Sequence, residues 1–448
     1  MFNALFERMQ ERTPVLMMVW SLLENVLNPD FVDSLFMHGA DRQYTRTLLF
    51  SDIVELMSTV VTGIHTSVHA AFKRSILEGR VSLVALYGKI NRIEPAICTT
   101  LVHEVAAKLH TVIEELEASL PPLIPGYRTR IVDGNVLGAS DHRLAPLRDV
   151  RSGPLPGKSL VVLDPDLQLA IAMIPCEDAH TQERALFPTL LESVRAGDAW
   201  IADRNFCTAD FLGGLHQRGA TFLIRQHAKL RWELVEPLAI PQGTTIGEHA
   251  VCIPHDGGTI IARRVVVRLD KPTRDGDLEL ALLTTVPADV LTAEQVAQRY
   301  RQRWSVEKLF HTLTTALRCE IKSQGYPKAA LFAFAVALVA SNIIATVRAG
   351  IRAVHGQQAE ESLSNFYLVR EIQSGYLAFE DGLAADVVEG RAAMSLPELA
   401  NFLRTCARHV RLSFYRKAPT GPYRTKAKRG TPDDPPHVST ARLILESK

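Results

Sequence analysis

The sequence has little that would mark a secreted protein or a zinc finger. Its six cysteines are scattered and none forms a C-x-x-C pair, so neither a disulfide framework nor a cysteine-rich metal site is indicated. This usage fits a reducing compartment, and we expect a cytoplasmic protein. The N-terminus, Met1 to Arg8, lacks the basic-then-apolar order of a signal peptide.

An excess of charge of either sign is also missing. The 448 residues include 50 Lys and Arg against 49 Asp and Glu, so the net charge does not indicate a polyanionic partner. Charge is uneven locally instead, because residues 400–432 contain nine Lys and Arg and no acidic residue. This segment is a candidate phosphate-binding tail, and a solvated basic tail without a partner is the alternative.

Long apolar runs are rare, and only one approaches the length of a membrane span. Ala329 to Val347 is uncharged over 19 residues, but Ser341, Asn342 and several alanines make it only mildly apolar. We therefore interpret it as a buried core helix and expect no membrane partner. A hydrophobic content of 47% supports real cores, and the length allows two to four domains of about 150 residues each.

The periodicity of the apolar residues changes along the chain. Residues 1–120 carry helical spacing, and the proline-rich stretch that follows ends this pattern. Residues 121–226 read as β-β-β-α-β-α-β, the layout of an RNase H-like core. Residues 227–277 read as a small all-β insertion, 278–350 as the rest of the core, and 351–448 as a helical region with the basic tail. The predicted fold class is α/β: an RNase H-like catalytic core interrupted by a small all-β insertion, with helical N-terminal and C-terminal regions.

A polar stripe is predicted on one long helix of the second half. The helix should begin after Thr292, with Gln295 completing a capping box, and run to about residue 317. Spacings of three and four residues place Tyr300, Arg303 and Glu307 on one face. We expect this stripe to lie outside the core. A hydroxyl, a guanidinium and a carboxylate together suit the binding of a phosphodiester beside a metal ion.

Two further carboxylates lie at predicted strand ends. Asp133 belongs to the first strand of the core and Asp203 follows the fourth. Each has a structural alternative, since an Asp at a strand end is frequently a turn former, and a lone Glu307 would be a solvated helix residue. The combination of all three predicts a two-metal site for phosphoryl transfer, because divalent metals of this kind prefer oxygen ligands.

Together these motifs resemble the DDE transposases of the insertion sequence four family. Tyr300, Arg303 and Glu307 match the first three members of the family signature Tyr-x2-Arg-x3-Glu-x6-Lys. Ile131 to Asn135 resembles the strand that carries the family's first Asp, and Ile201 to Phe206 resembles the motif of the second. An all-β insertion between the second Asp and the Glu is also a family feature, and the resemblance covers roughly residues 40–430.

The resemblance implies a DNA transposase of a bacterial insertion sequence, which cuts transposon ends and joins them to target DNA. Asp133, Asp203 and Glu307 would be the catalytic residues and would hold two Mg²⁺ ions, for which Mn²⁺ can substitute. The partners would be double-stranded DNA, as terminal inverted repeats and target, and a second copy in a homodimeric synaptic complex. The helices of residues 1–120 would recognise the transposon ends.

The resemblance also implies a set of DNA-binding residues: Tyr300, Arg303, Arg204, His311, Trp232, Arg416, Lys417, Lys426, Lys428 and Arg429. Trp232 could stack on an extruded base or simply pack in the core. Thr314 stands where the signature has Lys, so a phosphate contact is missing that His311 or Lys322 could supply. This departure leaves open a second function, a catalytically silent DNA-binding protein derived from a transposase.

Overall fold

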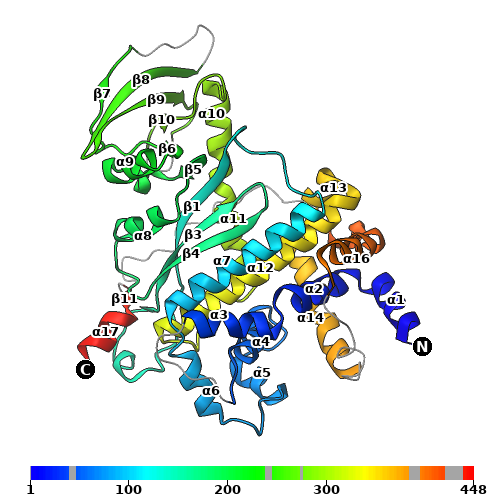
Figure 1. Ribbon diagram of the computed structural model, residues 1–448. Helices are drawn as coiled ribbons and strands as arrows, with labels where there is room; N and C mark the ends of the chain where they lie inside the picture. The colour runs from blue at the N-terminus through cyan, green and yellow to red at the C-terminus, as the bar shows by residue number, and fades with distance from the viewer. Residues whose placement is uncertain are drawn as a thin grey trace.

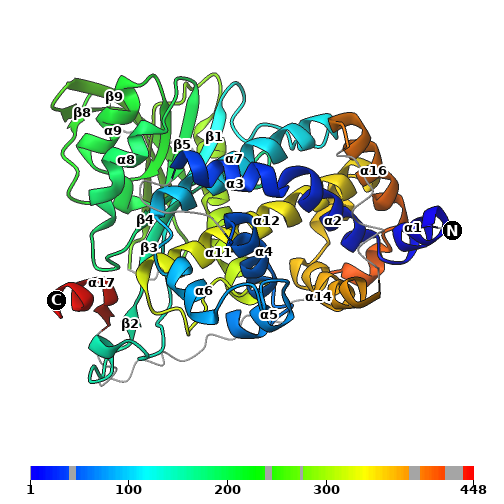
Figure 2. The ribbon, with the colours of Figure 1, turned by 60° about the horizontal axis from the view of Figure 1, so that its bottom comes forward.

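The computed structural model describes residues 2–39, 47–237, 245–272, 276–382, 394–418 and 437–447. In these residues a large mixed sheet lies beside a body of helices, and α1 and α17 lie at opposite ends of the molecule (Figures 1 and 2). The predicted α/β class is confirmed at this level. The predicted tail residues Lys426, Lys428 and Arg429 lie outside the described residues.

The helical body is built from both ends of the chain, so that segments far apart in sequence share one core. Its helices α7 and α12 run side by side, and α7 also packs along the strand β4 (Figure 1). The N-terminal helices are α1 (Phe2–Arg12), α2 (Pro14–Val26), α3 (Pro29–Gly39), α4 (Phe50–Val61), α5 (Val68–Arg74), α6 (Leu83–Ile90) and α7 (Pro95–Glu115). The C-terminal helices are α12 (Pro327–His355), α13 (Gln357–Glu361), α14 (Asn365–Gly382) and α16 (Leu396–His409).

Helix α12 contains the stretch that the sequence predicts as a buried core helix. Among the described helices it alone is long and apolar enough to cross a membrane, but 94% of its apolar window is buried inside the protein. Its Asn342 side chain donates to the carbonyl of Ala170 on β4 and accepts from the amide of the same residue, both at 2.8 Å. These contacts agree with the core-helix interpretation.

In the described part of the chain the main sheet has nine strands, in the order β4-β3-β1-β5-β6-β10-β9-β8-β7. The strands β1, β5 and β6 run parallel, and all the other neighbouring pairs are antiparallel. The strands are β1 (Arg128–Val136), β3 (Lys158–Asp164), β4 (Leu169–Cys176), β5 (Asp198–Ala202), β6 (Thr221–Arg225), β7 (Glu233–Leu234), β8 (Ile246–His255), β9 (Gly258–Arg268) and β10 (Glu279–Thr284). Strands β7 to β9, which lie in the segment predicted as an insertion, extend this sheet through β10.

Alternate residues of the central strands face two different helical layers, as the two-residue period of a strand requires. Ile131 and Ile201 pack against α10 (Ala293–Tyr300) and α11 (Trp304–Thr315). Val132 and Trp200 point the other way, toward α8 (Phe187–Glu192) and α9 (Ala209–Gln217). Since Asp133 and Asp203 keep the parity of Ile131 and Ile201, they belong to the face that α10 and α11 cover.

Several predicted elements differ in extent from those of the structure. The single helix expected after Thr292 is two α-helices joined by the 3₁₀ turn η4 (Arg301–Arg303), although its Thr292–Gln295 capping box is present. The first helix of the predicted β-β-β-α-β-α-β core is short, with η2 (Glu183–Leu186) before α8, because Pro188 is tolerated only in the first turn of an α-helix. In the predicted all-β insertion, the strand β7 has only two residues.

Short elements complete the described chain: η1 (Ala145–Leu147), β2 (Pro154–Leu155), η3 (Arg204–Phe206), η5 (Leu412–Tyr415), β11 (Val438–Ser439) and α17 (Thr440–Glu446). The strands β2 and β11 form a small parallel pair of their own. The elements η1, β2 and β11 were not predicted, whereas η5 and α17 fall in residues 351–448, which the sequence predicts as a helical region.

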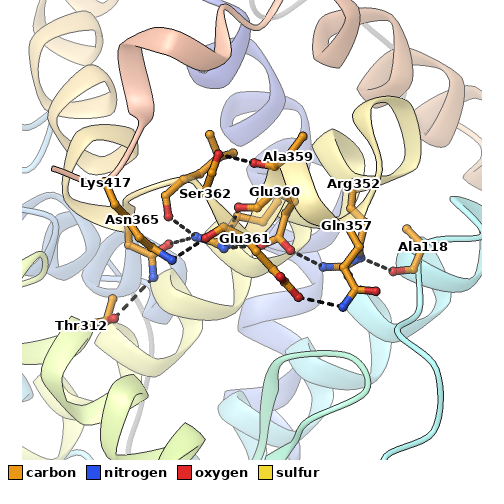
Figure 3. A network of polar contacts seen from close by, with 12 residues as sticks. Ala118, Thr312, Arg352, Gln357, Ala359, Glu360, Glu361, Ser362, Asn365 and Lys417 are labelled. Carbon is orange, nitrogen blue, oxygen red and sulfur yellow. Dashed lines mark hydrogen bonds and ion pairs between the residues drawn. The ribbon is translucent and has the colours of Figure 1, made fainter. Parts of the chain in front are cut away.

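A buried polar network connects α11 to the helical body (Figure 3). The fully buried Glu360 forms ion pairs with Arg348 and Arg352 of α12. Arg352 donates to the carbonyl of Ala118 beyond α7, and Asn365 contacts Thr312 of α11 at 3.4 Å. These contacts join side chains of α12, α13 and α14 to the segment after α7 and to α11. The network therefore links the helical body to the helix that carries Glu307.

Candidate active site

Asp133 and Asp203 lie at equivalent places on two adjacent parallel strands. The register pairs Ile131 of β1 with Ile201 of β5, and each aspartate comes two residues later. The pairing of β5 with β1 ends there, while β1 continues beside β3. Carboxyl ends of parallel strands are where α/β proteins commonly bind ligands, so the sheet brings both carboxylates to such an edge.

Arg303 connects Asp133 with Glu307. Its Nη1 donates to Asp133 Oδ2 at 3.0 Å and its Nη2 to Glu307 Oε1 at 2.5 Å. The side chains are 11% exposed for Arg303, 18% for Asp133 and 35% for Glu307, so the pairs are largely shielded from water. The structure thus brings together three of the residues that the sequence predicts to act together.

The electrostatics of this cluster are dominated by burial and by an excess of carboxylates. Burial raises the pKa of Asp133 to about 6, with further upward contributions from Asp203 and Glu307, although Arg303 opposes the shift. Burial lowers the pKa of Arg303, but Tyr300 and the two carboxylates raise it by more, so that the net shift is upward. The two shifts agree with each other: the attraction between Asp133 and Arg303 lowers the pKa of the carboxyl and raises that of the guanidinium, and at Asp133 burial outweighs it.

Only Asp203 performs the structural role that the sequence left open. Its carboxylate accepts a hydrogen bond from the Asn205 amide at 2.8 Å and caps η3. Asp133 lies inside β1 rather than at a strand end, and its carboxylate accepts from the amide of the next strand residue, Gly134, at 2.9 Å. Turn formation and a place in the acidic cluster are therefore compatible in Asp203.

Tyr300 does not belong to an exposed stripe, and that expectation is wrong. It is 8% exposed and packs in the apolar layer between α10 and the sheet, because α10 ends there and lays its last turn on the sheet. Burial raises the pKa of its hydroxyl to about 12, which keeps it neutral, while the interaction with Arg303 lowers this pKa. Its contact is therefore with the arginine rather than with solvent.

The other predicted DNA-binding residues lie at varied places. His311 and Thr314 are exposed on α11, and the Thr314 hydroxyl donates to the carbonyls of Phe310 and His311. Arg204 follows Asp203 directly in η3. The exposed Arg416 and Lys417 follow η5, where the Lys417 ammonium donates to the carbonyl of Glu361.

Trp232 packs rather than projecting from the surface. It lies against the core of the α8–α9 face, with its ring edge-on to His249 and under the guanidinium of Arg264 at 5.0 Å. These contacts support the packing role that the sequence left open beside base stacking.

Three polar residues near the acidic cluster were not predicted. Burial raises the pKa of Glu183 in η2, and the nearby Asp203 raises it further. Lys158 of β3 opposes this shift. His227, which follows β6, has its pKa lowered by burial first, with further lowering by Arg184, Lys229 and Arg204, while Asp203 opposes this. Of these three residues, only His227 could have been predicted from the sequence, because it directly follows the third parallel strand and so lies at the same edge of the sheet.

The donor set suits a hard divalent cation, because carboxylate oxygens are the ligands that Mg²⁺ and Mn²⁺ prefer. Burial is the main cause of the raised pKa of Asp133, and a cation would relieve the repulsion from Asp203 and Glu307 that adds to it. As they stand, no three His, Cys, Asp or Glu side chains of the described residues are grouped to hold one metal ion. Arg303 lies between Asp133 and Glu307, so a cation bound by these carboxylates would compete with its guanidinium.

The fold and the site define an α/β protein with carboxylates gathered at one edge of a mixed sheet. Residues 125–343, which carry all three predicted carboxylates, match the family model described as the transposase DDE domain. This match supports a DDE transposase, an enzyme that acts on DNA.

Comparison with solved structures gives a cryo-EM structure of a piggyBac transposase synaptic complex with hairpin DNA. The similarity has 13% sequence identity and a TM-score of 0.41, and it covers 94% of this chain and 90% of that chain. No curated protein matches the chain.

Proposed function

We propose that the protein is a DNA transposase of the insertion sequence four family, encoded by a bacterial insertion sequence and acting in the cytoplasm. It would cut the transposon ends and join them to target DNA, with Asp133, Asp203 and Glu307 as its catalytic carboxylates. The observation that carries the proposal is the Arg303 bridge, which joins Asp133 of β1 to Glu307 of α11 beside the end of β5. A turn former and a solvated helix residue would have no reason to share one buried arginine.

The strand order supports an RNase H-like core as the scaffold. Strands β4, β3, β1, β5 and β6 are neighbours in this order, with β3 antiparallel to β1 and β4 and with β1, β5 and β6 parallel. Strands β7 to β9 fall between Asp203 and Glu307 in sequence, as the proposed insertion requires. This arrangement delivers two carboxylates from strands and the third from a helix.

In the proposed mechanism water attacks the scissile phosphorus, the bond from phosphorus to the 3′ oxygen breaks, and a 3′ hydroxyl is released. That hydroxyl then attacks a phosphodiester of the target strand and displaces its 3′ oxygen. Bound Mg²⁺ or Mn²⁺ would polarise the phosphate and lower the pKa of the attacking water. Asp133, Asp203 and Glu307 are the residues that would hold the two ions.

The chain's own groups account for the handling of the DNA strand. Arg303 would leave its carboxylate partners and bind the non-bridging phosphate oxygens, to which its planar fork is well suited. The buried Tyr300 hydroxyl would orient that guanidinium. Arg204, beside Asp203, would neutralise a phosphate, and His311 would contact the strand from the exposed side of α11. The synaptic complex would contain a homodimer bound to both ends.

One observation favours a second function, the catalytically silent DNA-binding protein. Thr314 bonds to its own helix backbone and presents no cation where the family signature has Lys. A silent protein would hold transposon ends without cutting them. The carboxylates and their arginine are all present, so we propose the active enzyme.

The test is a strand-cleavage assay with Mg²⁺ on duplex DNA taken from the two flanks of the coding sequence in its element. The parent should nick these ends, and Asp133→Ala, Asp203→Ala and Glu307→Ala should each be inactive but still bind them. Asp149→Ala, which removes an exposed carboxylate, is the matched control and should cut like the parent. Equal cutting by all four variants would refute the assignment, and binding without cutting by the parent would favour the silent protein.

A further inference from the structure

The turn that carries Asp203 begins where the strand pairing of β5 stops. Pairing with β1 ends at Ile201 opposite Ile131, and pairing with β6 ends at Ala202 opposite Ile224. Asp203 lies beyond both points, in the turn that leads into η3. Contacts outside the strand pairing therefore help to set how its carboxylate lies relative to Asp133.

Glu183 supplies contacts on both sides of this gap. On one side, its carboxylate interacts with the Asn205 side chain, two residues after Asp203, which lowers the pKa of Glu183 against the larger upward effect of burial. On the other, it lies against the backbone of Gly134, where a Cβ would overlap the carboxylate of Glu183. Gly134 directly follows Asp133 on β1, so one side chain touches the immediate neighbourhood of both aspartates.

The segment around Glu183 is itself fixed against the same turn. The guanidinium of Arg184 donates to the carbonyl of Asn205 at 3.3 Å. The rings of Phe187 and Phe206 stack with their centroids 5.0 Å apart. The buried Lys158 donates to the carbonyl of Thr181, just before η2. Glu183 therefore reaches the site from an anchored backbone rather than from a free loop.

We propose that Glu183 is a positioning residue of the catalytic centre, whose carboxylate ties the Asp203 turn to the strand that carries Asp133. This inference rests on the proposed function. This role requires an acceptor oxygen on a side chain as long as that of Glu. It does not require the negative charge, because a charge beside Asp203 only adds repulsion. Partners of this kind commonly change metal affinity by about 10- to 100-fold when they are removed.

Two substitutions of Glu183 distinguish the effect of its acceptor oxygen from the effect of its negative charge. Glu183→Ala removes both and should weaken Mn²⁺ binding to the DNA-free protein by about tenfold, with a matching loss of kcat and little change in KM for DNA. Glu183→Gln keeps an acceptor for Asn205 and should stay within about threefold of the parent, a smaller loss than that of a removed partner. Glu192→Ala, an exposed glutamate on the adjoining α8, is the control and should bind like the parent.

Gly134→Ala offers an independent route, because its methyl group would push the carboxylate of Glu183 aside without deleting it. It should resemble Glu183→Ala, and the double variant should be no weaker than either one, since both changes act on the same contact. This variant also carries the test if Glu183→Ala fails to fold. Additive losses in the double variant would contradict the proposal.

Calorimetric titration with Mn²⁺ and the cleavage assay give the readouts. Parent-like binding by Glu183→Ala, or a loss in Glu183→Gln as large as in Glu183→Ala, would overturn the positioning role. Asp133→Asn, Asp203→Asn and Glu307→Gln measure the proposed function separately. If they abolish binding and Glu183→Ala does not change it, only this inference fails, and if they leave binding unchanged, the proposed metal site itself is wrong.

Discussion

Arg303 donates to Asp133 at 3.0 Å across 170 residues of sequence, and the same guanidinium also holds Glu307. The two carboxylates that should bind a cation are thus engaged by an internal cation. Because one guanidinium and a divalent ion would compete for the same oxygens, occupation of the site by metal requires Arg303 to find another partner. A DNA phosphate is the partner that the proposed reaction brings.

The first prediction follows from this competition. Arg303→Ala should bind Mn²⁺ more tightly than the parent in the absence of DNA, by about 3- to 10-fold, the equivalent of roughly 1 kcal/mol. The same variant should lose most of its strand cleavage, because the phosphate loses its bidentate partner. Calorimetry without DNA and the cleavage assay with DNA measure the two effects.

Arg301→Ala is the matched control, since Arg301 lies in the same 3₁₀ turn but is exposed. It should leave Mn²⁺ binding unchanged. If Arg303→Ala weakens Mn²⁺ binding instead, the arginine organises the carboxylates and does not compete with the ion.

A second prediction concerns stability and pH at Asp166, in the turn between β3 and β4. Burial raises its pKa to about 6, although the carboxylate accepts from the Leu123 amide at 2.9 Å. Because the folded-state value lies above the unfolded one, the group favours folding below about pH 4, and this contribution is lost as pH rises through 6. Asp166→Asn keeps the acceptor without the charge, so it should raise Tm at pH 8 by about 1 to 3 °C.

The gain should shrink toward zero as the pH approaches 4, which thermal unfolding at several pH values would show. A gain that is independent of pH, or a loss at pH 8, would mean that the carboxylate is not the group that titrates. Glu192→Gln, with an exposed carboxylate, should show no such trend.

The sequence places Asp133 and Asp203 on neighbouring parallel strands correctly, because apolar runs mark β1 and β5, but it does not show that β1 continues beyond Asp133 beside β3. It could not predict the burial of Tyr300, since helical spacing does not tell which side of the helix faces a sheet. The 3₁₀ turn before Trp304 was missed because no Gly or Pro marks it. Glu183 was missed for another reason: its link to Gly134 exists only in the folded chain.

A third prediction concerns the network under α12. Glu360→Ala would leave Arg348 and Arg352 buried without their carboxylate, so unfolding free energy should fall by about 3 kcal/mol or more. Glu361→Ala removes the exposed neighbour and should cost far less. Denaturant unfolding measures both. Equal effects of the two substitutions would show that the buried network contributes little.

A fourth prediction tests the departure from the family signature. Thr314→Lys adds a cation on the Glu307 face of α11 and should tighten binding to end DNA, with a salt dependence steeper by about 0.9 in log–log slope. Thr315→Lys adds the same charge about 100° around the helix and is the control. The DNA affinity of both variants, measured at several salt concentrations, tests this prediction. Equal gains in both variants would indicate a general charge effect, and no gain from Thr314→Lys would mean that another residue already provides the contact.

The central claim is that Asp133 binds the metal used in strand cleavage, and a change of ligand tests it most directly. Asp133→Cys replaces a hard oxygen ligand by a softer sulfur, which Mg²⁺ accepts poorly and Mn²⁺ accepts better. Cleavage by this variant should be absent with Mg²⁺ and recover with Mn²⁺, while Asp133→Ala stays inactive with both ions. Cleavage with Mg²⁺ at the parent's rate by either variant would contradict the account.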